Sequence, residues 1–110
     1  MTRGEPWTDE EIETIVDTYF TMLQLEFAGE PFVKAQVRRE LQAGALVARS
    51  NGPIEFKMQN ISAVLENYGR RWVEGYKPMH NYQAELERAV VQWLTARGVE
   101  LPEKRVRDRG

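Results

Sequence analysis

Hydrophobic residues recur at helical spacing in four stretches of the chain, separated by glycine and proline. The spacing predicts helices over residues 8–28, 32–43, 53–68 and 82–97, because side chains three and four positions apart share one face of a helix. The positions expected to form the core are Ile15, Tyr19, Leu23, Val37, Leu41, Ile61, Leu65, Leu86, Val90 and Trp93. The expected fold is therefore all-α, a small domain of about four helices.

Capping signals support these helices. Thr8 can cap the first one, and Glu11 at the third helical position completes a capping box. The turn 50–53 reads Ser-Asn-Gly-Pro and suits a helix start, since proline fits the first helical turn. Asn81 can cap the last helix, which should stop near Gly98.

Length and composition fit one domain in a reducing compartment. The chain has 110 residues, so we expect one helical domain over residues 1–98 and a flexible basic tail or linker over 99–110. There are no cysteines, which excludes disulfides and zinc–thiolate sites and fits a cytoplasmic location. No apolar run approaches the roughly 18 residues that a membrane span needs.

The charge is unevenly distributed along the chain. Residues 1–30 carry one base against eight acids, a balance of −7, and the rest carries 14 bases against nine acids, a balance of +5. The overall charge therefore argues against a generally basic nucleic-acid-binding protein. A basic face on an otherwise acidic domain is still possible.

The sequence offers no catalytic constellation. His80 is the one histidine, without a second ligand that would suggest a metal site, and we interpret it as a partly exposed loop residue. The glycines match neither a phosphate-binding loop nor a dinucleotide fingerprint. We expect a protein without an active site or cofactor of its own.

The stretch from Arg49 to Tyr82 carries five bases against three acids, with amide side chains interleaved. Lysine and arginine neutralise phosphates, and asparagine or glutamine can pair with adenine in the major groove. Lys57 and Asn60, three positions apart on the third helix, suit a recognition helix. The competing interpretation is the ordinary solvent-exposed face of an amphipathic helix. The candidate DNA contacts are Arg49, Ser50, Lys57, Gln59, Asn60, Arg70, Arg71, Tyr76, Lys77 and Asn81.

The loop 75–82 is rich in aromatic and polar residues and is bounded by glycine and proline. Such loops often bind ligands. The alternative is a structural cover, with Tyr76 and Tyr82 packed on the core.

Two motifs carry a resemblance to known families. Trp7-Thr8-Asp9-Glu10-Glu11 and the Arg49-Ser50 turn into the third helix resemble the Myb/SANT trihelical plan. The stretch 49–65, with Gly75-Tyr76-Lys77-Pro78 and Asn81-Tyr82-Gln83, resembles the helical N-terminal module of some bacterial HNH-type restriction endonucleases and related defence proteins.

This resemblance, over residues 7–95, implies a module that targets DNA while a separate domain cuts it. By position, Arg49, Lys57 and Asn60 would be the contacts of the recognition helix. The first helix is longer than in a Myb repeat, and the 110 residues contain no HNH nuclease motif.

The leading hypothesis is a non-catalytic, helix-turn-helix-like module for double-stranded DNA, with a nuclease domain or another protein as a possible partner. The alternative is a protein-interaction or oligomerisation module that uses the tyrosine-rich loop and the apolar helix faces. A small enzyme ranks third, because no nucleophile or metal site can be assembled.

Overall fold

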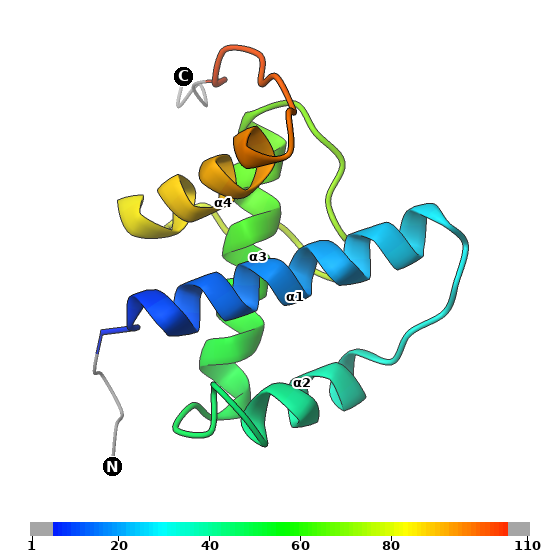
Figure 1. Cartoon of the computed structure of the whole chain (residues 1–110), viewed down its shortest axis with the longest axis vertical. Helices are drawn as coiled ribbons and strands as arrows, with labels where there is room; N and C mark the ends of the chain where they lie inside the picture. The colour runs from blue at the N-terminus through cyan, green and yellow to red at the C-terminus, as the bar shows by residue number, and fades with distance from the viewer. Residues whose placement is uncertain (1–5, 106–110) are drawn as a thin grey trace.

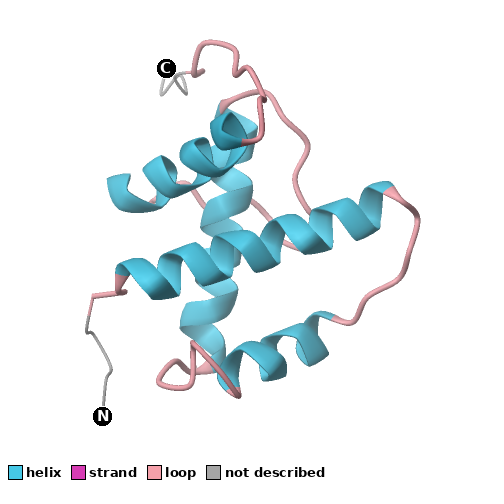
Figure 2. Cartoon of the chain, viewed as in Figure 1, coloured by secondary structure: helices cyan, strands magenta, loops and turns pink. Residues whose placement is uncertain are grey.

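The computed structural model describes residues 6–105, which form four helices and, within that range, no strand (Figure 2). The helices are α1 (Asp9–Phe27), α2 (Lys34–Gln42), α3 (Asn51–Asn67) and α4 (Ala84–Ala96). The expected all-α fold of four helices is confirmed. None of these helices is both long enough and apolar enough to cross a membrane.

The start of α1 is fixed by the expected capping box. The Thr8 hydroxyl accepts the Glu11 N–H at 3.1 Å, and the Glu11 carboxylate accepts the Thr8 N–H at 2.9 Å. These bonds satisfy two N–H groups that have no partner within the helix. After α1, Gly29 takes a φ of +72°, a left-handed conformation that glycine adopts without a steric penalty.

The third helix is the centre of the domain. α1 and α4 lie side by side and run in the same direction, and α3 crosses behind both of them (Figure 1). Six consecutive residues of α3, from Asn60 to Leu65, are buried, so this part of the helix is covered on all sides. The C-terminal half of α3 is therefore part of the core.

The polar groups in this core are paired. The Tyr19 hydroxyl lies 2.7 Å from the Ser62 hydroxyl and accepts the Val73 N–H at 2.8 Å. Burial raises the pKa of Tyr19, so this hydroxyl stays neutral. The two bonds join α1 to α3 and to the connection between α3 and α4, and they avoid the cost of an unpaired buried hydroxyl.

Most of the expected core is confirmed, with two exceptions. The buried members are Ile15, Tyr19, Leu23, Leu41, Ile61, Leu65, Leu86 and Val90. Val37 and Trp93 are only half-buried and pack against the edge of the core. Trp7, Trp72 and Tyr82 lie at the same edge.

The last helix starts later than its expected cap. Gln83, not Asn81, is the residue before α4, and no side-chain bond caps the helix there. The segment before α4 is fastened to α3, since the Met79 N–H donates to the Gln59 carbonyl at 3.1 Å and the Tyr82 hydroxyl accepts from the Asn67 amide at 2.8 Å.

The folded part of the chain continues beyond the expected boundary at residue 98. Val99 and Leu101 pack against the core, and Lys104 forms a 3.0 Å ion pair with Glu87. The Arg105 N–H donates to the Asn67 carbonyl at 2.7 Å. The rest of the expected tail, 106–110, lies outside the described residues.

Candidate nucleic-acid interface

Arg49, the first candidate contact, is held inside the domain. Its Nε and Nη2 atoms donate to the two carboxylate oxygens of Glu11 at 2.9 and 2.7 Å, and Nη2 also donates to the Pro6 carbonyl at 3.0 Å. Only 8% of the Arg49 side chain is exposed. Hydrogen bonds from Arg49 hold the pKa of Glu11 below its ordinary value, despite the opposing effect of burial. The pair therefore ties the turn before α3 to α1, and Arg49 is not free to meet a phosphate.

Asn60 is also an internal residue, and its amide is not presented to solvent. The side chain is 1% exposed, and its Nδ2 donates to the Met79 carbonyl at 2.6 Å. Asn60 faces the segment between α3 and α4, which covers this side of the helix. Its amide fastens that segment to α3.

Tyr76 belongs to the core edge, as the structural alternative for the loop predicts. The residue is 3% exposed, and burial raises its pKa to about 12. The Lys34 ammonium lies 4.3 Å from the ring centroid and donates to the Gly75 carbonyl at 2.7 Å. Tyr76 thus anchors the loop and presents no aromatic face to a ligand.

Lys57 lies on α3, beside the N-terminus of α1. Its ammonium lies 5.0 Å from the Trp7 ring centroid. Partial burial lowers the Lys57 pKa, and the nearby Arg49 charge lowers it further. Ser50 is exposed and precedes α3 without a side-chain capping bond, and Gln59 is half-buried.

The four other candidates lie on the connection 68–83. Lys77, Asn81 and Arg71 are exposed, and Arg70 is half-buried. The Arg71 guanidinium stacks 4.8 Å from the Phe27 ring centroid, at the C-terminal end of α1. Among residues 6–105, no acid forms an ion pair with Arg70, Arg71 or Lys77.

The candidates therefore separate into two groups. Lys57 lies over Trp7, just before α1, and Arg71 lies over Phe27, its last residue. The 19 residues of α1 extend about 28 Å. The single face expected around Arg49, Lys57 and Asn60, with Arg70, Arg71 and Lys77 beside it, is not formed.

Sequence reasoning missed Arg38 as a neighbour of this connection. Arg38 lies close enough to Tyr76 for its charge to lower the pKa of that phenol, against the larger effect of burial. Its Nε is buried without a hydrogen-bond partner in the described part of the chain. The spacing in α2 could have indicated it, since Arg38 follows Lys34 by one turn.

His80 is half-buried in the loop and bonds through Nε2 to the Glu66 carboxylate at 2.6 Å. Over residues 6–105, no three histidine, cysteine or acidic side chains gather as metal ligands would.

Comparisons with known proteins give no relative. No protein-family model, curated protein or solved structure matches the chain.

Proposed function

We propose that this domain is a non-catalytic module that contacts double-stranded DNA through its basic edge, which we define as Arg38, Arg70, Arg71 and Lys77. The proposal keeps the function expected from the sequence and moves the contact surface away from α3. The observation that carries it is the placement of Arg70, Arg71 and Lys77 on one connection, without an acidic partner among the described residues.

The shape of the basic edge suits phosphates better than bases. Three of its four side chains come from a non-helical connection, and one comes from α2. Basic side chains along an extended segment can follow a phosphate backbone without reading its sequence. We therefore assign no base-reading residue, and sequence preference would come from another part of the protein.

Acidic side chains lie both beside the basic edge and away from it, and Arg71 shares a small pocket with Glu26 and Glu74. Glu26 and Glu74 lie near the basic edge, where the Glu26 carboxylate accepts the Glu74 N–H at 3.2 Å. Three of the six acids of α1 lie elsewhere: Asp9, Glu13 and Asp17 line its side toward α4. A duplex on the basic edge would avoid them, which limits repulsion.

The resemblance of residues 7–95 to targeting modules of HNH-type restriction enzymes points to the same class of function. In that setting a separate nuclease domain would cut, and this domain would hold DNA near it. The alternative interface, the tyrosine-rich loop, loses support because Tyr76 is buried.

The test is fluorescence anisotropy with a labelled duplex at several salt concentrations. Binding should weaken steeply with salt, and Arg71→Ala or Lys77→Ala should flatten the slope by about one unit per lost phosphate contact. Arg88→Ala is the matched control, because Arg88 is an exposed base on α4 without an ion pair in the described residues. Equal binding by all three variants would remove the basic edge as the contact surface.

A further inference from the structure

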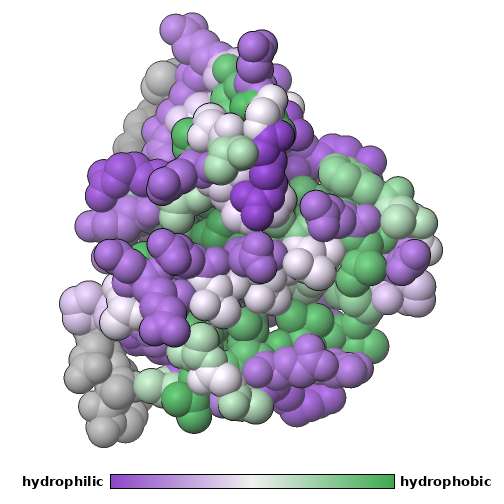
Figure 3. Space-filling model, viewed as in Figure 1, coloured by the Kyte–Doolittle hydropathy of each residue, from purple (hydrophilic) through white to green (hydrophobic). Residues whose placement is uncertain are grey.

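An open groove with a volume of about 570 Å³ lies between α1 and α4. In Figure 3, hydrophobic atoms are visible between two hydrophilic rows that follow these helices. The groove is lined by Asp9, Ile12, Glu13, Val16, Asp17, Glu85, Arg88, Ala89, Gln92, Trp93, Ala96 and Arg97. It lies apart from the residues of the basic edge.

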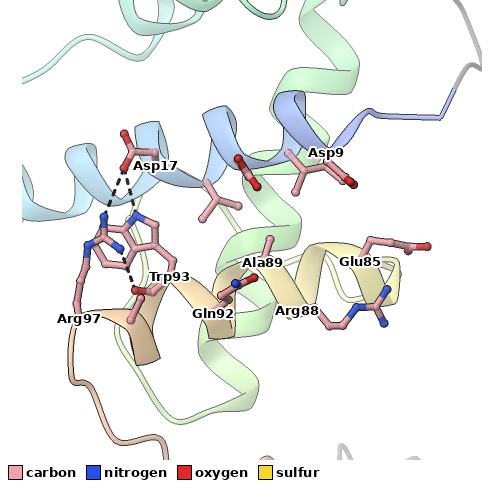
Figure 4. A pocket seen from close by; sticks show the side chains of 12 residues that line it. Asp9, Asp17, Glu85, Arg88, Ala89, Gln92, Trp93 and Arg97 are labelled. Carbon is pink, nitrogen blue, oxygen red and sulfur yellow. Dashed lines mark hydrogen bonds and ion pairs between the residues drawn. The ribbon is translucent and has the colours of Figure 1, made fainter.

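One end of the groove is closed by an ordered stack. The Trp93 ring lies parallel to Phe20 at 4.0 Å, and the Arg97 guanidinium covers Trp93 at 3.7 Å from the ring centroid. The Trp93 indole N–H donates to the Asp17 carboxylate at 3.2 Å (Figure 4). The charged side chains at this end, Asp17 and Arg97, already have partners within the domain.

The other end is open and acidic. Asp9 and Glu13 lie one turn apart on α1, and Glu85 lines the same groove from α4. Within residues 6–105, no hydrogen bond or ion pair engages these three carboxylates. Arg88 lines this end and Lys57 lies close enough to Glu85 to be influenced by its charge, so three acids stand against two bases and the local balance is −1. Asp9 and Glu13 repel one another across one helical turn, whereas the helix dipole favours acids near this N-terminus.

Between these ends the floor is apolar. Ile12 and Val16 of α1 are buried there, and the small side chain of Ala89 leaves the hollow open on the α4 side. An occupant therefore needs both a cationic group and an aliphatic part. Lysine and arginine combine the two, since their stems can lie on apolar surface while their heads reach carboxylates.

We propose that this groove binds a short cationic peptide segment of a partner protein. Basic heads of the segment pair with Asp9, Glu13 and Glu85, and aliphatic side chains lie on Ala89, on the edge of Trp93 and on the exposed part of Ile12. The volume is in the range of sites that enclose a small ligand or a few residues of peptide. DNA is excluded from this surface by its charge, so the groove and the basic edge serve two different partners.

The probe is a short fluorescein-labelled peptide in which lysines alternate with leucines, added to the whole chain. The double variant Glu13→Gln/Glu85→Gln should bind it roughly five- to tenfold more weakly, as expected for the loss of two partly exposed ion pairs. Glu10→Gln is the matched control, because Glu10 is an exposed acid of the first turn of α1 outside the groove. The same peptide with glutamate in place of lysine should not bind.

A second measurement locates the peptide and checks the fold. In a ¹⁵N spectrum the Trp93 indole signal should shift on titration, whereas the amides of Arg71 and Lys77 should not. Glu13→Gln should melt no lower than the parent, because it relieves repulsion. Equal weakening by Glu10→Gln, absence of peptide binding, or shifts confined to the basic edge would each overturn the proposal. None of these results depends on whether DNA binds.

Discussion

The Arg49 guanidinium holds the Glu11 carboxylate at two points, with nitrogen–oxygen distances of 2.7 and 2.9 Å across 38 positions of sequence. The same carboxylate caps α1 by accepting the Thr8 N–H. Only 8% of the Arg49 side chain and 11% of the Glu11 side chain are exposed. Arg49, which the sequence suggests as a DNA contact, therefore has a structural role in the fold.

Replacing Glu11 by glutamine should therefore destabilise the domain. The variant leaves the Arg49 charge without its partner in a poorly hydrated place, which costs about 1–3 kcal/mol of unfolding free energy. Urea denaturation followed by circular dichroism measures it. The neighbouring Glu10→Gln should change the value by less than about half a kcal/mol; similar losses in the two variants would mean that the pair adds nothing.

The same carboxylate gives a pH dependence with a defined sign. The pKa of Glu11 in the folded protein lies below its ordinary value of 4.5, so the unfolded chain binds a proton more readily. Its contribution is complete above pH 4.5 and is lost as the pH falls through the lower folded pKa. Unfolding free energy measured against pH should fall less steeply below that value in Glu11→Gln than in the parent. Parallel curves would contradict the lowered pKa.

Ile61→Ala should cost roughly 2–5 kcal/mol, through lost burial and the cavity that remains. Ile61 is fully buried on α3, where α1 and α4 cross it. Thermal or urea unfolding provides the measurement, with Val47→Ala as control, because Val47 is 73% exposed. A loss below about half a kcal/mol at Ile61 would mean that α3 is packed less tightly than described.

Asn60→Ala separates a structural amide from a base-reading one. It removes the hydrogen bond to the Met79 carbonyl and should lower the unfolding free energy by about 1–3 kcal/mol. Where the variant is folded, its DNA affinity should match that of the parent on every duplex. A stable variant with altered preference at one base pair would restore Asn60 as a reader.

The sequence predicts most of the fold because its signals are local. The capping box needs only Thr8 and Glu11, and the helical spacing of residues such as Ile15 and Tyr19 places them in the core without knowledge of the other helices. The consecutive small and apolar residues at 61–65 are a signal that α3 is buried on all sides.

The candidate site could not be predicted in the same way, because its residues depend on distant contacts. From the sequence, Arg49 resembles a phosphate ligand, but in the fold it pairs with Glu11. Asn60 is expected to be exposed, but the segment that contains Met79 covers it. The groove between α1 and α4 depends on how two helices far apart in sequence approach each other. Trp93 is half-buried for the same reason, since one face meets Phe20 and the other meets Arg97.

The most direct test of the proposed function is a ¹⁵N amide spectrum of the whole chain, titrated with a duplex at low salt. DNA contact at the basic edge predicts that the signals of Arg70, Arg71 and Lys77 shift together, with the side-chain signal of Arg38. The amides of Glu13 and Gln92, which line the acidic groove, should keep their positions, and the shifts should vanish as salt is raised. Shifts centred on α1 and α4, or no shift with any duplex, would contradict the account.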